Sequence, residues 1–171
     1  MVREILTYPN PKLREVSKDV TSFDAKLHAL LDDMYDTMIE RGGVGLAAIQ
    51  IGVELNAVVI NPVNEEGEQK KEDLIEFINP QIIESDGTIL FQEGCLSVPS
   101  VYEDVERFEK VKVRFFDRAG DECVKEYEGF MSVAVQHEID HLRGRLFIEK
   151  LSYLKRKKFE KEWKKKLKAK A

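Results

Sequence analysis

The chain has 171 residues, a length that fits one domain of ordinary size. Hydrophobic residues make up 43% of it, which is enough for a sizeable core and excludes a fully disordered chain. No apolar run approaches the roughly 18 residues that indicate a membrane span. Two cysteines do not make a disulfide framework, and the N-terminus lacks the apolar segment of a secretory signal. We therefore expect a cytoplasmic protein with free or metal-bound thiols.

The charge is unevenly distributed along the chain. The formal net charge is −5, but residues 151–171 carry ten Lys/Arg and two Glu, a balance of +8. Residues 1–150 then carry 17 basic and 30 acidic side chains, a balance of −13. This asymmetry predicts an acidic body, residues 1–150, and a basic C-terminal helix, residues 151–171, that is an appendage and not a separate domain.

Helical periodicity begins early in the chain. A turn at residues 9–11 is expected to open a short helical turn. Apolar residues then repeat every three or four positions between Leu27 and Met38, a spacing typical of an amphipathic helix. Residues 21–22 can cap this helix, and the Gly42-Gly43 pair ends it at about residue 41.

Residues 57–127 change to short β-rich segments separated by turn signals. The polar stretch 64–73 is expected to form a surface loop in a hairpin. A second helix is predicted over residues 130–142, and Ser152 can cap a third, basic helix. These elements predict an α+β fold with antiparallel strands around one central helix; the expected strands are residues 57–60, 75–78, 81–84, 88–91, 111–116 and 122–127.

The second predicted helix carries an H-E-x-x-H motif, residues 137–141. Residues four apart lie on one helix face, so His137 and His141 can bind one metal ion. Glu138 lies about 100° around the helix and borders the site, where a general base for an attacking water belongs. The alternative interpretation is a pair of exposed helix histidines.

A catalytic metal site needs a third protein ligand. The metzincin pattern would place a histidine at position 147, but that position is Phe147. Cys95 follows a predicted strand and lies beside Gly94, so its thiolate is the candidate ligand, against the alternative of a small buried apolar residue. Cys123 lies within a strand, has no ligand-like neighbour and is expected in the core.

A third motif, residues 43–50, combines two glycines, two alanines and a terminal Gln50. Its G-x-G follows a helix and not a strand, so a dinucleotide-binding fingerprint does not fit. Such small residues indicate a backbone that closely approaches another group, and the Gln50 amide could donate to an oxyanion. A tight turn with small packing residues is the alternative.

The motifs at residues 43–50, 93–97 and 136–141 together resemble, in order and spacing, the three signatures of bacterial-type peptide deformylases. The resemblance extends to about residue 154. It implies an α+β fold with a central H-E-x-x-H helix, and a metal held by Cys95, His137, His141 and one water. It also implies removal of formyl from the N-terminal Met of nascent polypeptides with release of formate. The implied metal is Fe(II) in the cell, with Ni, Co or Zn possible in preparations.

The resemblance also implies roles for individual groups. Glu138 would take a proton from water and pass it to the leaving amine, while the Gln50 amide and the Leu96 backbone N–H donate to the formyl oxygen. The backbone of the small-residue motifs would hold the substrate as an added strand. The substrate-binding residues expected there are Gly43, Val44, Gly45 and Gly94.

An apolar pocket is needed for the substrate's methionine side chain. Val133 and Ala134 share the helix face of His137 and are the expected walls, with Val44 opposite; both also fit an ordinary core. Asp140 either anchors the helix to Arg107, a position that is arginine in related enzymes, or is an exposed acid. Family members often carry an arginine near the substrate where this chain has Tyr102.

Two other classes compete with this interpretation. The interpretation as a zinc metallopeptidase depends on the H-E-x-x-H motif alone. The interpretation as a non-catalytic nucleic-acid or ribosome-binding module depends on the basic tail. Phe147 and Cys95 disfavour the first, while Glu138 and Gln50 disfavour the second. The basic helix could instead hold the enzyme on the ribosome by salt-dependent attraction to RNA phosphates. Neither DNA nor a membrane is an expected partner.

Overall fold

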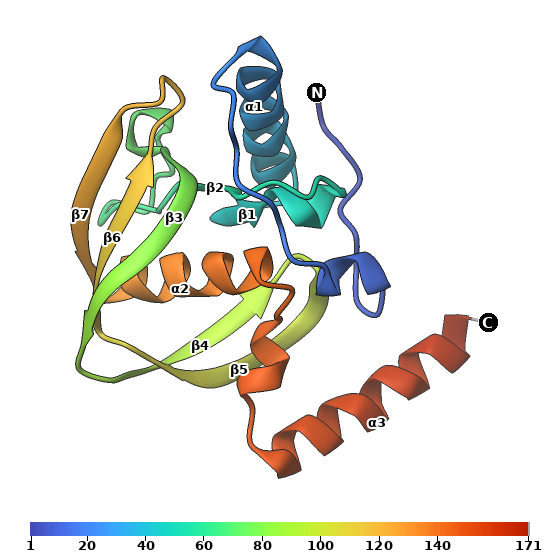
Figure 1. The fold of residues 1–171 in the computed structure, drawn as a ribbon. Helices are drawn as coiled ribbons and strands as arrows, with labels where there is room; N and C mark the ends of the chain where they lie inside the picture. Colours follow the sequence, from blue (N-terminus) through green and yellow to red (C-terminus); the bar gives the residue numbers. More distant parts are fainter. Residues whose placement is uncertain (171) are drawn as a thin grey trace.

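The structure is a computed structural model that describes residues 1–170 (Figure 1). Ala171, the last residue of the predicted basic tail, lies outside the described residues. Two antiparallel sheets form the β part. The larger has the order β1-β2-β3-β6-β7, and the smaller pairs β4 with β5. The strands are β1 (Gly45–Ala47), β2 (Ala57–Ile60), β3 (Ile75–Asp86), β4 (Ile89–Cys95), β5 (Val98–Arg107), β6 (Lys110–Phe116) and β7 (Glu122–Glu128).

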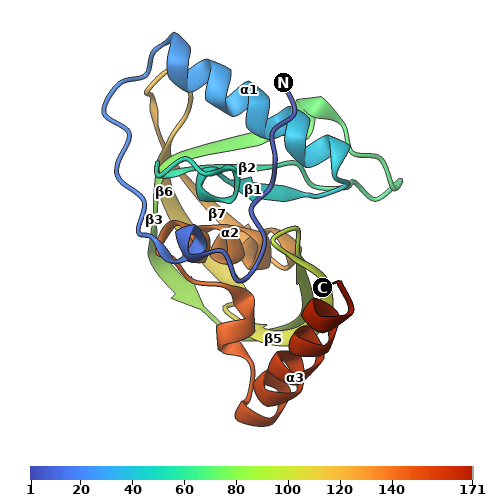
Figure 2. The same cartoon turned by 90° about the vertical axis from the view of Figure 1, so that its right-hand side faces the viewer.

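The central helix α2 (Phe130–Leu142) lies between the two sheets (Figure 1). Helix α1 (Ala25–Glu40) packs against β1 and β2, and helix α3 (Tyr153–Lys170) lies at one end of the molecule near β5 (Figure 2). The predicted α+β class with a central H-E-x-x-H helix and a C-terminal helix is confirmed. Four short 3-10 helices complete the described elements: η1 (Pro11–Arg14), η2 (Ala48–Ile51), η3 (Lys71–Asp73) and η4 (Phe147–Lys150).

The buried apolar residues form three clusters. The first joins α1 to β1 and β2, and the second fills the space between the larger sheet and α2. The third, which we call the rear cluster, joins β5 and residues 146–151 to α3; its buried members are Val98, Val105, Leu146, Phe147, Ile148, Leu151 and Phe159. Because α2 contacts both sheets, ten of its residues are buried, including both histidines and Glu138.

The predicted start of the first helix was wrong. The helix begins at Ala25, and its cap is Asp24, whose Oδ1 accepts from the backbone N–H of Leu27 at 3.1 Å. Threonine, serine and aspartate all serve as N-caps, so residue type alone did not locate the cap. The predicted bounds of α2 were correct, and Ser152 does cap α3, since its hydroxyl accepts from the N–H of Lys155 at 3.4 Å.

Two of the predicted strands need correction, and two further strands were not predicted. The expected strands 75–78 and 81–84 are one strand, β3, with a register shift between Ile78 and Gln81. Asn79 adopts a φ of 51° at that irregularity and exchanges two hydrogen bonds with the backbone of Val20. Strands β1 and β5 were not expected, because glycine-rich and charged sequences of this kind do not show a β-pattern. The other predicted strands and the loop 64–73 between β2 and β3 are present.

Within residues 1–170, no helix combines the length and apolar composition needed to cross a bilayer.

Candidate active site

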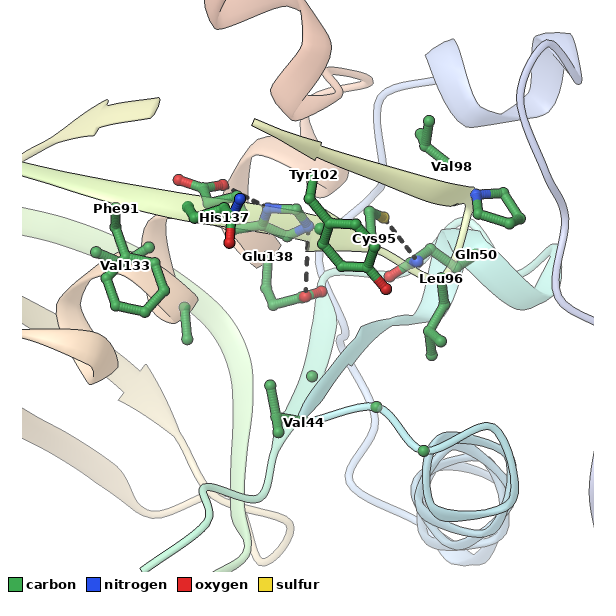
Figure 3. Close-up of a pocket in the computed structure, with 18 of the residues that line it drawn as sticks. Val44, Gln50, Phe91, Cys95, Leu96, Val98, Tyr102, Val133, His137 and Glu138 are labelled. Atoms are coloured by element: carbon green, nitrogen blue, oxygen red, sulfur yellow. Dashed lines mark hydrogen bonds and ion pairs between the residues drawn. The ribbon is translucent and has the colours of Figure 1, made fainter. Parts of the chain in front are cut away.

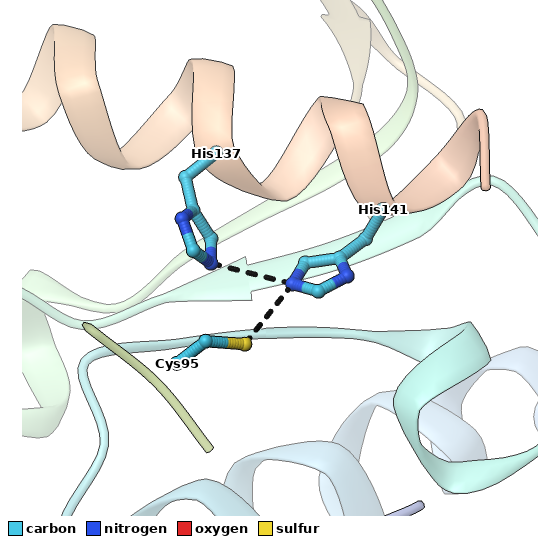
Figure 4. A group of neighbouring side chains, drawn as sticks. All are labelled: Cys95, His137 and His141. Carbon is cyan, nitrogen blue, oxygen red and sulfur yellow. Dashed lines mark hydrogen bonds between the residues drawn. The ribbon is translucent and has the colours of Figure 1, made fainter. Parts of the chain in front are cut away.

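Helix α2 and the end of β4 bring three potential metal ligands together (Figure 4). The Nε2 atoms of His137 and His141 lie 3.3 Å apart, and Cys95 Sγ lies 3.3 Å from His141 Nε2. One ligand atom from each of the three residues lies within 4.8 Å of the others. The two histidines meet because they are one helical turn apart, whereas Cys95 arrives from the smaller sheet.

This spacing fits a single divalent metal ion. Two nitrogen atoms that each lie about 2.0–2.1 Å from a tetrahedral ion are about 3.3–3.4 Å apart, which agrees with the observed separation. Cys95 is half-buried and both histidines are buried. His141 Nδ1 is buried and has no hydrogen-bond partner among the described residues, whereas its Nε2 faces His137 Nε2 and Cys95 Sγ. The chemistry and geometry of this donor set therefore suit a metal.

A buried carboxylate orients His137. Glu93 Oε1 lies 2.8 Å from His137 Nδ1, and because a carboxylate only accepts, the Nδ1 atom carries the proton. That leaves the Nε2 lone pair for a metal. Arg107 donates to both Glu93 oxygens, at 2.7 and 2.8 Å, and to Asp140 Oδ2 at 2.6 Å. Burial opposes ionisation of Glu93, but hydrogen bonds from Arg107 and His137 hold its pKa below the usual range.

Glu138 borders the ligands without joining them. Its Oε1 lies 3.9 Å from His137 Nε2, and its Oε2 is buried with no hydrogen-bond partner among the described residues. Burial raises the pKa of the Glu138 carboxyl to about 7. A Cβ at Gly45 would lie 2.9 Å from Glu138 Oε1, so a larger residue there would press on this carboxyl group.

The 3-10 helix η2 supplies Gln50, which is 1% exposed. Its Oε1 accepts from the N–H of Ala47 at 2.9 Å, which fixes the direction of the amide. Its Nε2 then lies 3.0 Å from Ser97 Oγ and 3.6 Å from Cys95 Sγ. The Gln50 amide is therefore directed at the metal ligands across the space between the two sheets.

A cavity of about 430 Å³ opens beside these groups (Figure 3). In Figure 3, Phe91 and Val133 lie on one side, His137 and Glu138 lie in the middle, and Gln50 and Leu96 lie on the other. All twelve residues that the sequence assigned to the site fall in this region. The cavity lining includes eleven of them: Gly43, Val44, Gly45, Gln50, Gly94, Cys95, Leu96, Val133, Ala134, His137 and Glu138. The twelfth, His141, lies with Cys95 and His137 in the group of potential metal ligands.

Sequence analysis missed several residues of the site. Glu93 stands directly before Gly94 in a motif that was recognised, yet its contact with His137 spans 44 positions. Phe91 and Phe130, with ring centroids 5.8 Å apart, extend the apolar wall. The expected contact of Asp140 with Arg107 is confirmed. Tyr102 lies against Gly94, where an added Cβ would come within 2.6 Å of its ring.

The site combines three convergent side chains that can bind a metal, a buried carboxyl group beside them and an adjoining apolar cavity. These are the features of a metal-dependent hydrolase. Comparisons with known proteins give its family. The profile of the polypeptide deformylase family matches residues 2–157. The chain is 59% identical over 169 residues to a peptide deformylase of Nautilia profundicola, covering 99% of this chain and 97% of that one.

Solved structures agree with the sequence match. A peptide deformylase from Legionella pneumophila is 43% identical and superposes with a TM-score of 0.88, covering 100% of this chain and 99% of that one. A Met-Ala-Ser-bound class I type b peptide deformylase from Acinetobacter baumannii is 32% identical, with a TM-score of 0.82, covering 88% and 99%. The chain belongs to the polypeptide deformylase family, metal-dependent hydrolases that remove the N-terminal formyl group from nascent polypeptides. This membership favours the deformylase interpretation over the metallopeptidase and non-catalytic alternatives.

Proposed function

We propose that Cys95, His137 and His141 hold one divalent metal ion in this deformylase, and that Glu138 is the general acid–base of the reaction. The observation that carries the proposal is the convergence of three ligand atoms within 4.8 Å, with the Glu138 carboxyl 3.9 Å from one of them. When bound, the metal would supply Lewis acidity to a water molecule and to the formyl carbonyl.

The remaining steps belong to side chains of the protein. Glu138 accepts a proton from the attacking water, whose oxygen adds to the formyl carbon. The bond between that carbon and the methionine nitrogen then breaks, and Glu138 returns the proton to the departing amine. Formate and a free N-terminal methionine result. Burial of Glu138 keeps bulk water from competing for this proton.

Negative charge develops on the formyl oxygen as water adds. The Gln50 amide and the Leu96 backbone N–H are the proposed donors to that oxygen, and one such donor is typically worth about 3–4 kcal/mol of transition-state stabilisation. The hydrogen bonds that fix Gln50 to Ala47 and Ser97 support this role, because the amide does not need to reorganise during the reaction.

The substrate chain is proposed to lie between two sheet edges. β1 ends the larger sheet and β4 pairs with β5, so each presents one edge without a strand partner among the described residues. A peptide backbone could therefore pair with residues 44–45 and with Gly94. Gly43 lines the cavity, but its N–H donates to Met38 and its carbonyl accepts from Gln69, so it contributes space and not hydrogen bonds.

The methionine side chain is proposed to enter the apolar part of the cavity. Val133 and Ala134 form its floor on α2, and Val44 lies across from them. The Met-Ala-Ser tripeptide bound by the Acinetobacter relative supports a site for methionine followed by small residues. Exposed Tyr102 stands where the peptide would leave the cavity.

The proposed metal in the cell is Fe(II), with Ni, Co or Zn in some preparations. A set of one thiolate and two imidazoles suits several of these ions and does not select one by itself. Metal analysis of protein purified without oxygen, followed by turnover after reloading with each ion, tests the assignment. Dominant zinc in such protein, with higher activity than the iron form, would contradict it.

Formate release from formyl-Met-Ala-Ser tests the proposed roles. Wild-type protein should release formate, and Glu138→Gln should retain its metal while losing turnover by several orders of magnitude. Gln has nearly the same shape but cannot accept the proton. Retained turnover in Glu138→Gln would remove this residue as the general base.

The basic helix and the cellular compartment form a second part of the proposal. Basic side chains of α3 from Lys155 to Lys168 are exposed, and the enzyme's substrates emerge from a particle covered with RNA phosphate. We infer that α3 docks the enzyme on the ribosome in the cytoplasm, and that residues 1–150 form the catalytic domain.

A further inference from the structure

The N-terminal segment, residues 5–9, spans the two loops that carry the proposed catalytic groups. The N–H of Leu6 donates to the carbonyl oxygen of Gln50 at 2.7 Å, and the N–H of Tyr8 donates to that of Ser97 at 2.7 Å. One short segment therefore bonds both to η2, which follows β1 of the larger sheet, and to the β4–β5 turn of the smaller sheet.

Ser97 is the point at which this attachment reaches the site. Its backbone N–H donates to Cys95 Sγ at 3.4 Å, and its hydroxyl accepts from Gln50 Nε2 at 3.0 Å. Its carbonyl accepts from Tyr8. All three polar groups of one buried serine are thus used to join the N-terminal segment, the proposed oxyanion donor and the proposed thiolate ligand.

The Tyr8 side chain is held in turn by α3. Its ring lies 5.4 Å from the ring of Phe159 and 5.5 Å from that of Trp163, both in edge-to-face arrangements, and the latter two rings lie 5.6 Å apart. We call Tyr8, Phe159 and Trp163 the aromatic triad. Phe159 is a buried member of the rear cluster, and Tyr8, Trp163 and Cys95 pack against that cluster. Such ring pairs stabilise their packing beyond the effect of their buried area.

We propose that Tyr8 is a positioning residue for deformylation: the aromatic triad makes α3 part of the support that sets the distance between the Gln50 amide and the Cys95 thiolate. The inference rests on the proposed roles of Gln50 and Cys95. It assigns to α3 a function inside the enzyme, independent of docking on any partner.

The expected effect on the reaction follows from geometry. Gln50 lies in η2, directly after β1 of the larger sheet, whereas Cys95 ends β4 of the smaller sheet. Within the described residues, the N-terminal segment bonds to both of these regions. Without the ring of Tyr8, residues 6–8 lose their anchor, and the two loops gain freedom to separate. Displacement of a catalytic group by about 1 Å can cost on the order of 100-fold in rate. The methionine pocket on α2 is not touched, so KM should change little.

The test compares Tyr8→Ala, Tyr8→Phe, Trp163→Ala and the double variant Tyr8→Ala/Trp163→Ala in metal-loaded full-length protein. Tyr8→Ala should lower kcat for formyl-Met-Ala-Ser by about 10- to 100-fold with KM nearly unchanged. Tyr8→Phe keeps the ring and should match wild type. Trp163→Ala should lower kcat less, and the double variant should be no slower than Tyr8→Ala, because both changes release the same support.

Two readouts separate positioning from general stability. In cobalt-loaded protein, the thiolate-to-metal absorption band should shift in Tyr8→Ala and stay unchanged in Tyr8→Phe. Fluorescence of Trp163, the chain's one tryptophan, should report loosening of α3 in Tyr8→Ala. Phe23→Ala is the matched control: Phe23 packs on Phe116 at 6.0 Å in the cluster around α1, so it should lower the melting temperature without moving the cobalt band.

An unchanged cobalt band and kcat within twofold of wild type in Tyr8→Ala would overturn the proposal. Equal losses in Phe23→Ala, or a loss in Tyr8→Phe as large as in Tyr8→Ala, would overturn it too. If Tyr8→Ala fails to fold, Trp163→Ala decides by the same criteria. Failure of the proposed roles of Gln50 and Cys95 is distinguishable, because Gln50→Ala and Cys95→Ser would then release formate at the wild-type rate.

Discussion

Glu93 and His137, 44 positions apart, are joined by a buried 2.8 Å hydrogen bond that fixes the protonated nitrogen of the imidazole. Their side chains are 4% and 9% exposed. The partner of the histidine is therefore as buried as the histidine itself, and the orientation of one proposed ligand depends on a residue that binds no metal.

Glu93→Gln should weaken metal binding by about 10- to 100-fold, a typical cost of removing the partner of a ligating histidine. The amide N–H of glutamine would also face an N–H of Arg107 or His137. Two donors would then meet without an acceptor between them. Competition with a chelator measures the loss. Glu76→Gln is the matched control, because Glu76 pairs with Arg118 outside the site. Equal metal affinity in the two variants would show that Glu93 does not orient His137.

Cys95→Ser should lower metal content and with it formate release, since a neutral hydroxyl replaces a thiolate ligand. Cys123→Ser provides the comparison: this half-buried thiol packs beside the cluster between the larger sheet and α2. It should keep the wild-type metal content. Elemental analysis of both proteins after the same purification gives the answer, and unchanged metal in Cys95→Ser would remove Cys95 from the ligand set.

Gly45→Ala should reduce kcat while leaving metal content intact, because the new Cβ would press on Glu138 at 2.9 Å and displace the proposed base. Gly43→Ala meets Leu96 Cδ1, the end of a flexible side chain that can rotate away, so its effect should be smaller. Steady-state kinetics of the two variants tests the difference. A larger kcat loss in Gly43→Ala would argue against close packing of Gly45 on Glu138.

Gly144→Ala should destabilise the fold by about 2–3 kcal/mol, near the upper end for single substitutions. Gly144 has a φ of 75°, and a Cβ there would overlap the backbone carbonyl of Arg14. Gly67→Ala isolates the cost of backbone conformation, because Gly67 has a φ of 81° and no atom within 4 Å of an added Cβ. Urea unfolding should show the larger loss in Gly144→Ala; equal losses would mean that the contact with Arg14 relaxes freely.

Replacement of Lys161, Lys164 and Lys168 by Gln should weaken ribosome binding, most visibly at low salt, and leave formyl-peptide turnover unchanged. Removing the same number of charges at Lys110, Lys112 and Lys125, on β6 and β7, is the control. Sedimentation with ribosomes over a salt series measures binding. If both triple variants bind alike, α3 is not the docking element.

Deletion of the residues after Lys155 would be an ambiguous test of the basic helix. The deletion also removes Phe159 and Trp163, which pack on Tyr8. Lost peptide turnover in the truncated protein would then report loss of the aromatic triad and not the role of the charges. Substitution of exposed lysines leaves that packing in place.

Local pattern was sufficient for the parts of the site that depend on short-range geometry. The pairing of His137 with His141, and the place of Glu138 beside them, follow from one helical turn, which is the same in any fold. The bounds of α2 were likewise readable from periodicity and from Gly144. Cys95 was a candidate ligand because it follows a predicted strand beside Gly94, and Gln50 was a candidate donor because it ends a motif of small residues. The family resemblance linked both to the histidines, and the structure brings both to the same cavity.

Contacts between distant segments needed the tertiary structure. The bond of Glu93 to His137, the packing of Gly45 on Glu138 and the attachment of Tyr8 to Ser97 each depend on how the two sheets and α2 are placed. The charge of residues 151–171 identified a basic helix, but only the fold shows that its residues Phe159 and Trp163 pack against Tyr8. Periodicity specifies which residues share a face, whereas the partner of that face is decided by packing of the whole core.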